Sequence, residues 1–162
     1  MATANFTAYE VRHLLDARKF VSRIVRDTQG SDRPDRAKEI VWDIRRRDMP
    51  RKDLRLRLYA RLLSSLPGIG TKSTPGVSLQ WKGKNIRKLD YALRHDSIRY
   101  GVSAGHVDGW HEHIWTDEDE DRHVIPASPP VKGQDMRSVV RWCAQQWKIE
   151  LDELGEQFTI RS

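Results

Sequence analysis

The spacing of apolar residues changes near residue 77, and this change constrains the fold more than any other feature of the chain. In the first 65 residues, apolar side chains recur every three or four positions, as they do along one face of a helix. From Val77 onward, segments such as VSLQW alternate apolar and polar residues, which is typical of a half-buried strand. We therefore expect an α+β fold, with helices first and strands second.

The expected elements follow from these two patterns and from the Gly and Pro residues that interrupt them. The 162 residues suit one domain, or one domain with a helical extension. Thr7, with Glu10 three residues later, forms a capping-box pattern at the start of the first helix. Helices are expected over 8–28, 34–48, 51–65 and 134–154, and strands over 77–81, 86–95, 110–116 and 122–126. The expected organisation is a basic helical region over 1–66, a turn or linker over 67–76, and an antiparallel sheet with a C-terminal helix over 77–162.

Positive charge is concentrated in the N-terminal part of the chain. The net charge is +6, and residues 1–65 contain 16 Lys and Arg against 9 Asp and Glu. Such an excess favours a nucleic acid or an acidic protein as partner, although a solvated, arginine-rich helix face also explains it. Of the two nucleic acids, RNA is expected rather than DNA. The candidate nucleic-acid-binding residues are Arg45, Arg46, Arg47, Arg51, Lys52, Arg55, Arg57, Arg61, Lys72, Arg94 and Arg122.

Histidines gather in one strand-like stretch between Asp90 and Pro126, which holds five of the six in the chain. Residues two apart on a strand share a face, so His111 and His113 are expected to point the same way. If the strand that contains Asp90 and His95 pairs beside them, all four side chains converge. The acidic run over 117–121 is expected to be a solvated hairpin tip.

Three interpretations of the histidines remain open. They can be polar positions of a half-buried sheet, or neutral imidazoles that bind a transition metal. Alternatively, one histidine can accept the proton of a ribose 2′-OH while another protonates the leaving oxygen. The catalytic hypothesis is a metal-independent endoribonuclease without a cofactor, in which His111 and His113 are the acid and base. Asp90 and His95 orient them, and Arg94 or Arg122 steadies the phosphate.

The C-terminal half, about residues 77–150, resembles the small toxins of TumE-type toxin–antitoxin pairs. The matching segments are LDYALRHD (89–96), GWHEHIW (109–115), the hairpin DEDEDRHVIP (117–126) and VVRWCAQQW (139–147). The resemblance implies a compact antiparallel sheet with a closing helix, a nucleic-acid-directed and ribonuclease-like activity, and an antitoxin as protein partner. The chain differs from that pattern in its longer loop over 96–108 and in its N-terminal 65 residues.

Two further classes of function compete with the ribonuclease. One is a non-enzymatic nucleic-acid-binding module, and the other is an interaction subunit or inhibitor in a prokaryotic or phage defence-related complex. The chain has no run of 18 apolar residues and no secretory signal pattern, so we expect neither a membrane helix nor a membrane partner. Cys143 is the single cysteine, which excludes an internal disulfide. A cytoplasmic location is expected.

Overall fold

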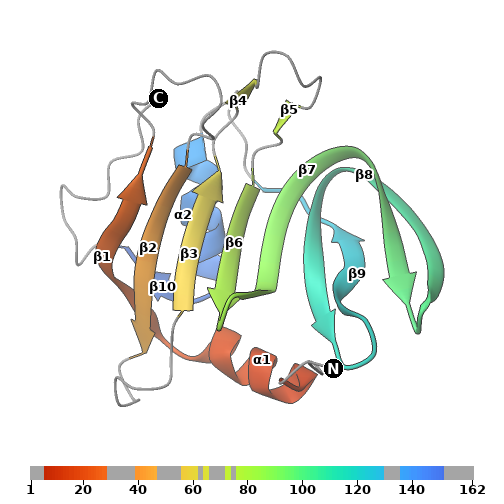
Figure 1. Ribbon diagram of the computed structural model, residues 1–162, viewed down its shortest axis with the longest axis horizontal. Coiled ribbons are helices and arrows are strands. Elements are labelled where there is room, and N and C mark those ends of the chain that lie inside the picture. The colour runs from red at the N-terminus through yellow and green to blue at the C-terminus, as the bar shows by residue number, and fades with distance from the viewer. Residues whose placement is uncertain are drawn as a thin grey trace.

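The computed structural model describes residues 6–28, 39–46, 56–61, 64–65, 72–73, 76–129 and 136–151. The elements are α1 (Ala8–Asp16), β1 (Lys19–Asp27), β2 (Glu39–Arg46), β3 (Leu56–Arg61), β4 (Ser64–Ser65), β5 (Lys72–Ser73), β6 (Gly76–Trp81), β7 (Lys84–Arg99), β8 (Val102–Thr116), β9 (Glu120–Pro126), α2 (Met136–Gln146) and β10 (Ile149–Glu150). One eight-stranded sheet has the order β10-β1-β2-β3-β6-β7-β8-β9, and β4 pairs with β5 separately (Figure 1). All neighbouring strands of the eight-stranded sheet are antiparallel except β1 and β10, which are parallel to each other.

The predicted basic helical region at the N-terminus is wrong. Of the described residues before 66, only Ala8–Asp16 is helical, and β1, β2 and β3 occupy the stretches expected to be helices. The reason is that apolar residues such as Ile40, Trp42 and Ile44 also lie two apart, which places them on one face of a strand. Because β3 pairs with β6, a single sheet continues from the part expected to be helical into the part expected to be strands.

The N-terminal cap of α1 is the one predicted from the sequence. Thr7 accepts a hydrogen bond from the backbone N–H of Glu10, whose carboxylate accepts one from Thr7 N–H at 2.7 Å, so the capping box is confirmed. The helix ends early because the buried Lys19 Nζ donates to the carbonyls of Leu14, Leu15 and Ala17 at 2.6, 3.0 and 2.7 Å. These bonds satisfy carbonyls that have no partner within a helix end.

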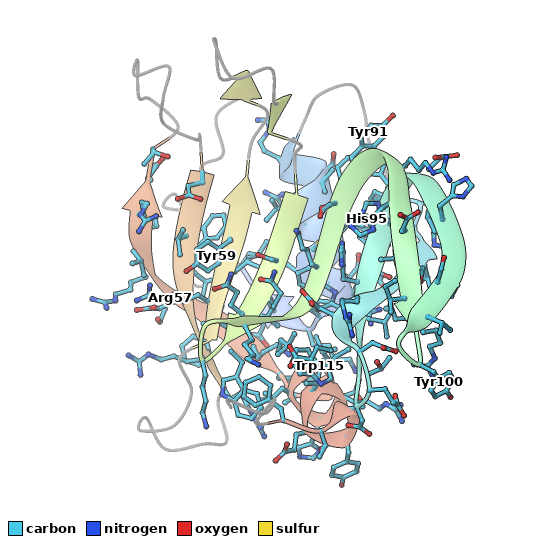
Figure 2. All side chains as sticks on the ribbon, turned by 45° about the vertical axis from the view of Figure 1, so that its right-hand side comes forward. Arg57, Tyr59, Tyr91, His95, Tyr100 and Trp115 are labelled. Carbon is cyan, nitrogen blue, oxygen red and sulfur yellow. The ribbon has the colours of Figure 1, made fainter. Side chains whose placement is uncertain are left out.

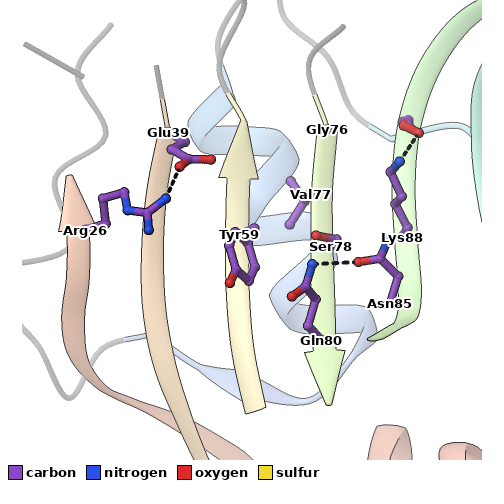
Figure 3. A pocket seen from close by; sticks show the side chains of 10 residues that line it. Arg26, Glu39, Tyr59, Gly76, Val77, Ser78, Gln80, Asn85 and Lys88 are labelled. Carbon is purple, nitrogen blue, oxygen red and sulfur yellow. Dashed lines mark hydrogen bonds and ion pairs between the residues drawn. The ribbon is translucent and has the colours of Figure 1, made fainter. Parts of the chain in front are cut away.

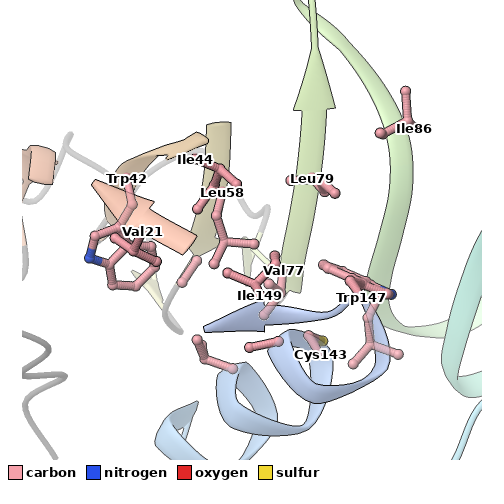
Figure 4. Close-up of a cluster of buried hydrophobic side chains, with 14 of the residues drawn as sticks. Val21, Trp42, Ile44, Leu58, Val77, Leu79, Ile86, Cys143, Trp147 and Ile149 are labelled. Atoms are coloured by element: carbon pink, nitrogen blue, oxygen red, sulfur yellow. The ribbon is translucent and has the colours of Figure 1, made fainter. Parts of the chain in front are cut away.

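The hydrophobic core lies between one face of the sheet and α2 (Figure 4). Val77 and Leu79 of β6 point into it, together with Leu58 of β3, Cys143 of α2 and Trp147 directly after α2. Strand side chains alternate between faces, so the intervening residues project from the opposite face of the sheet, called here the open face. Neither described helix is long and apolar enough to cross a membrane.

Strands β7 and β8 form a long hairpin that bends over the open face. The pairing shifts between Ala92 and His95 and again between Asp96 and Ile98, and bulges of this kind bend the strand that carries them. Gly109, which is paired with Ala92, has φ of +88°, a conformation that favours glycine. The second half of β7 therefore reaches β9, where Ser97 Oγ accepts a hydrogen bond from Val124 N–H at 3.0 Å. In Figure 2, His95 lies inside this arch.

Asp119 fastens the tip of the bent hairpin. Its carboxylate accepts hydrogen bonds from the backbone N–H groups of Tyr100 at 2.6 Å and Gly101 at 2.7 Å. The acidic run is thus a turn between β8 and β9, as expected, but the Asp119 side chain is buried, whereas Asp117 and Glu118 are exposed. The buried carboxylate takes the place of water as the acceptor for two backbone N–H groups. It thereby connects the turn between β8 and β9 to the turn between β7 and β8.

We predict that Asp119→Ala lowers the free energy of unfolding by about 2 kcal/mol or more, because two backbone donors lose a charged acceptor. Chemical denaturation monitored by tryptophan fluorescence measures this change. Glu118→Ala is the matched control, since Glu118 is exposed in the same turn. Equal stability of the two variants would show that the carboxylate does not hold the bend.

Candidate metal centre

Three histidines meet on the open face, beneath the bend of β7. His111 and His113 point to this face from β8, where they pair with Asp90 and Lys88 of β7. His95 reaches them through the bend. The ring centroids of His95 and His111 are 4.7 Å apart, those of His95 and His113 are 4.9 Å apart, and those of His111 and His113 are 5.1 Å apart. The convergence expected from the two-residue spacing is therefore present.

Backbone carbonyls orient all three rings in the same way. The Nδ1 atom of each histidine lies within hydrogen-bond distance of a carbonyl oxygen, and a carbonyl can only accept, so Nδ1 carries the proton. In the neutral ring this leaves a lone pair on Nε2. The three pairs are His95 with Asp96 O at 2.9 Å, His111 with Gly109 O at 2.9 Å, and His113 with Asp121 O at 2.8 Å.

Two of the lone pairs that result, those of His111 and His113, have no hydrogen-bond donor within the described residues. Nε2 of His111 and Nε2 of His113 are both buried and lack a hydrogen bond there. One ring nitrogen from each of His95, His111 and His113 lies within 4.8 Å of the other two. A tetrahedral Zn²⁺ with Zn–N bonds of about 2.0–2.1 Å needs nitrogens about 3.3 Å apart, so small ring rotations would close the set around an ion. Three imidazole nitrogens suit Zn²⁺ and related transition metals.

Asp90 adds a carboxylate at the edge of the histidine cluster. Its Oδ2 lies 2.8 Å from Lys88 Nζ and 3.4 Å from His113 Nε2, while Oδ1 is buried without a partner among the described residues. Burial acts to raise the pKa of Asp90, but the polar contact with His113 and the interaction with Lys88 outweigh it and lower the pKa to about 2. The carboxylate is therefore ionised at neutral pH.

The contact between His113 and Asp90 requires a positive charge. If Nδ1 of His113 carries the proton, the Nε2 lone pair faces an ionised carboxylate, and two acceptors at that distance repel each other. Either a second proton on His113 or a metal ion between the groups removes the repulsion. For His111, burial lowers the pKa, with further contributions from the neighbouring histidines, against the opposing effects of the Gly109 carbonyl and Asp90. This favours the neutral imidazole, the form that binds metals.

Gly76 makes room for the carboxylate. A Cβ atom at this position would lie 3.0 Å from the carbonyl oxygen of Leu89 and 3.4 Å from Asp90 Oδ1. A larger residue on β6 would therefore displace the Asp90 side chain or the neighbouring backbone of β7. The absence of a side chain at Gly76 also opens a hollow on the sheet beside the histidine cluster.

That hollow is a pocket of about 200 Å³ on the open face, shown in Figure 3. It is lined mainly by polar side chains from β1, β2, β3, β6 and β7. Lys88 and Asp90 belong both to this pocket and to the surroundings of His113, so the pocket adjoins the histidine cluster. The lining residues are Arg26, Glu39, Tyr59, Gly76, Val77, Ser78, Gln80, Asn85, Lys88 and Asp90.

The described candidate nucleic-acid-binding residues of the first 65 positions lie on strands and not on the expected helices. Arg45 is exposed on β2, Arg94 is exposed on β7, and Arg122 is exposed on β9. Arg46 is half-buried on β2, and Arg57 of β3 forms an ion pair with Asp43 at 3.4 Å. Arg61 and Lys72 belong to β3 and β5, with side chains outside the described set, and Arg47, Arg51, Lys52 and Arg55 lie outside the described residues.

The sequence analysis missed Lys88, Gly76 and the pocket residues. Lys88 was detectable, because it lies two residues before Asp90 in a stretch expected to be a strand and therefore shares its face. Gly76 and Tyr59 carried no such signal, since they lie in stretches expected to be a linker and a helix. His106, by contrast, is exposed and lies 3.9 Å from Asp108, outside the cluster.

Comparison of the chain with protein-family models, with curated proteins and with solved structures gives no significant match. The resemblance to TumE-type toxins therefore stays a prediction, and the histidine cluster has to be interpreted from its own geometry.

Proposed function

We propose that the chain is a metal-dependent hydrolase that cleaves phosphodiester bonds of nucleic acid. The observation that carries this proposal is the common orientation of His95, His111 and His113, in which backbone carbonyls hold each Nδ1 and leave Nε2 available. Such second-layer hydrogen bonds are typical of histidines that bind metals. A metal-free acid–base mechanism uses the same residues but needs a protonated histidine, which burial disfavours at His111.

The chemistry proposed for this centre is activation of a water molecule. A divalent metal held by three protein ligands keeps an open position and lowers the pKa of its bound water to about 7. Asp90, ionised and next to His113, would accept a hydrogen bond from that water and orient it. Lys88, which lies 2.8 Å from Asp90, would place positive charge beside the phosphate as negative charge develops. His95 is only half-buried, so substrate can reach the centre from its side.

Cations on the open face support a nucleic acid as substrate. Arg45 shares the face of Asp43 by alternation along β2, and Asp43 pairs across the strands with Arg57. Arg57 and Lys88 each lie beside a carboxylate, and with Arg45 they place cationic hydrogen-bond donors on the surface that leads to the histidine cluster, in a chain of net charge +6. Phosphate contacts of this kind position a nucleic acid without reading its sequence. We also propose that the substrate is RNA, that an antitoxin-like protein is a partner and that the protein is cytoplasmic.

Metal binding tests the first half of the proposal. We expect untagged protein to bind one equivalent of Co²⁺ or Zn²⁺, with Co²⁺ giving the visible absorption of a tetrahedral site. Ala substitution of His95, His111 or His113 should weaken binding at least about 10-fold, since each removes a ligand. His106→Ala is the control, because it removes an exposed histidine outside the cluster. Absence of Co²⁺ uptake, or equal uptake by a variant lacking all three histidines, would contradict the site.

Cleavage of labelled single-stranded RNA and DNA tests the second half. The Zn²⁺-loaded protein should cleave RNA, lose this activity in EDTA and recover it when Zn²⁺ is restored. Asp90→Asn should lower the cleavage rate about 10- to 100-fold while Zn²⁺ still binds, because it removes the charged acceptor that orients the water but few of the contacts around it. Cleavage that survives EDTA but not His111→Ala would instead support metal-free acid–base catalysis. A metal-loaded protein that cleaves neither polymer would refute the nucleic-acid substrate.

A further inference from the structure

We infer that the pocket beside the histidine cluster receives a single nucleobase of the substrate strand, stacked on Tyr59. This inference rests on the proposed function and names the part of the substrate that the pocket recognises.

A row of residues runs from Tyr59 to the histidine cluster across four strands of the open face. Tyr59 pairs with Ser78, Ser78 pairs with Lys88, and Lys88 pairs with His113. Neighbouring strands lie about 4.7–4.9 Å apart, so the row is roughly 14 Å long. A bound strand that lies along this row would place one base at Tyr59 and a backbone phosphate near Lys88 and the centre.

The hollow exists because β6 contributes small residues to this face. Ser78 lies between the larger side chains of Tyr59 on β3 and Lys88 on β7, and Gly76 lies beside Asp90 (Figure 3). The volume of about 200 Å³ is below the roughly 300–1,000 Å³ of sites for drug-sized ligands, so it holds one small group and excludes a duplex. The half-buried ring of Tyr59 at its side offers a stacking surface, which a planar group uses better than any other.

The charges in the pocket favour a neutral base over a phosphate. Arg26 is paired with Glu39 at 2.8 Å, and Lys88 is paired with Asp90 at 2.8 Å, so each cation is balanced by a carboxylate. A phosphate bound deep between these pairs would meet two anions as well as two cations. A neutral ring meets no such repulsion, and the cations at the rim remain suited to its flanking phosphates.

The amides at one end of the pocket provide the matching polar edge. Gln80 Nε2 donates to Asn85 Oδ1 at 2.9 Å. This bond fixes both amides and leaves the Gln80 carbonyl as an acceptor and the Asn85 amino group as a donor. Amide side chains present an adjacent acceptor and donor to the edge of a nucleobase. Proteins recognise the unstacked bases of single-stranded RNA through hydrogen bonds of this kind.

The experiment measures binding of short fluorescent single-stranded RNA in EDTA, and cleavage of the same RNA with Zn²⁺. Tyr59→Leu should weaken binding roughly 5- to 150-fold, the loss expected when one stacked base loses its aromatic partner. Tyr59→Phe should bind within about 3-fold of the native protein, because it keeps the ring. Tyr91→Leu is the matched control, since Tyr91 is an exposed tyrosine that follows Asp90 on β7 and so faces the other way.

A second pair of variants tests the hollow itself. Ser78→Leu fills the space between Tyr59 and Lys88 and should weaken binding as Tyr59→Leu does, whereas Ser78→Ala should not. Thermal unfolding identifies any variant that has lost its fold. Native-like RNA binding by folded Tyr59→Leu and Ser78→Leu, with cleavage intact, would overturn the inference and leave the proposed function standing. If the native protein neither binds nor cleaves any oligonucleotide, the proposed function falls as well.

Discussion

The bend of β7 is the constraint on which the histidine cluster depends. His95 pairs with Val107, and His111 lies four residues farther along β8. On a flat sheet this separation would be about 13 Å, yet the two rings lie 4.7 Å apart. The bulges after Ala92 and after Asp96 provide the curvature, and Asp119 holds the end of the bent hairpin against the next turn. The bent hairpin of β7 and β8 thereby encloses the three histidines without any further helix or strand of the described chain.

The enclosure buries polar atoms without hydrogen-bond partners in the described part of the chain, which lowers the stability of the fold unless a ligand binds them. Asp90 Oδ1 and the Nε2 atoms of His111 and His113 are buried without a hydrogen bond among the described residues. Buried polar atoms of this kind are uncommon in folded proteins, and they gather where a chain is organised for function rather than for stability. The backbone carbonyls that hold each Nδ1 keep the three Nε2 atoms directed toward one another, apart from small ring rotations. The metal ion proposed above would give the Nε2 atoms of His111 and His113 a common partner.

The sequence predicted the contents of this site better than the fold that surrounds it. The two-residue spacing of His111 and His113 placed them on one face, and Asp90 and His95 joined them as expected. The N-terminal helices failed because a spacing such as Ile40, Val41 and Ile44 fits one helical face, whereas Ile40, Trp42 and Ile44 fit one strand face. Trp42 was the residue that distinguished the two patterns, since it has no place on the helical stripe. The bulges of β7 and the hollow at Gly76 depend on pairing between distant segments, which no local pattern contains.

Replacing the helical region by strands changes what the arginines can do. On helices the arginines would form a basic surface separate from the histidines, so that binding and chemistry would belong to different parts of the chain. In the sheet, Arg45, Arg57 and the pocket lie on the face that continues into the cluster, and β7 is the strand that joins them. Lys88 and Asp90 belong to both regions, because each lines the pocket and Asp90 also contacts His113. A ligand that disturbs the ion pair between Lys88 and Asp90 would therefore alter the charge beside the proposed metal, which couples substrate binding to the chemistry through one pair of side chains.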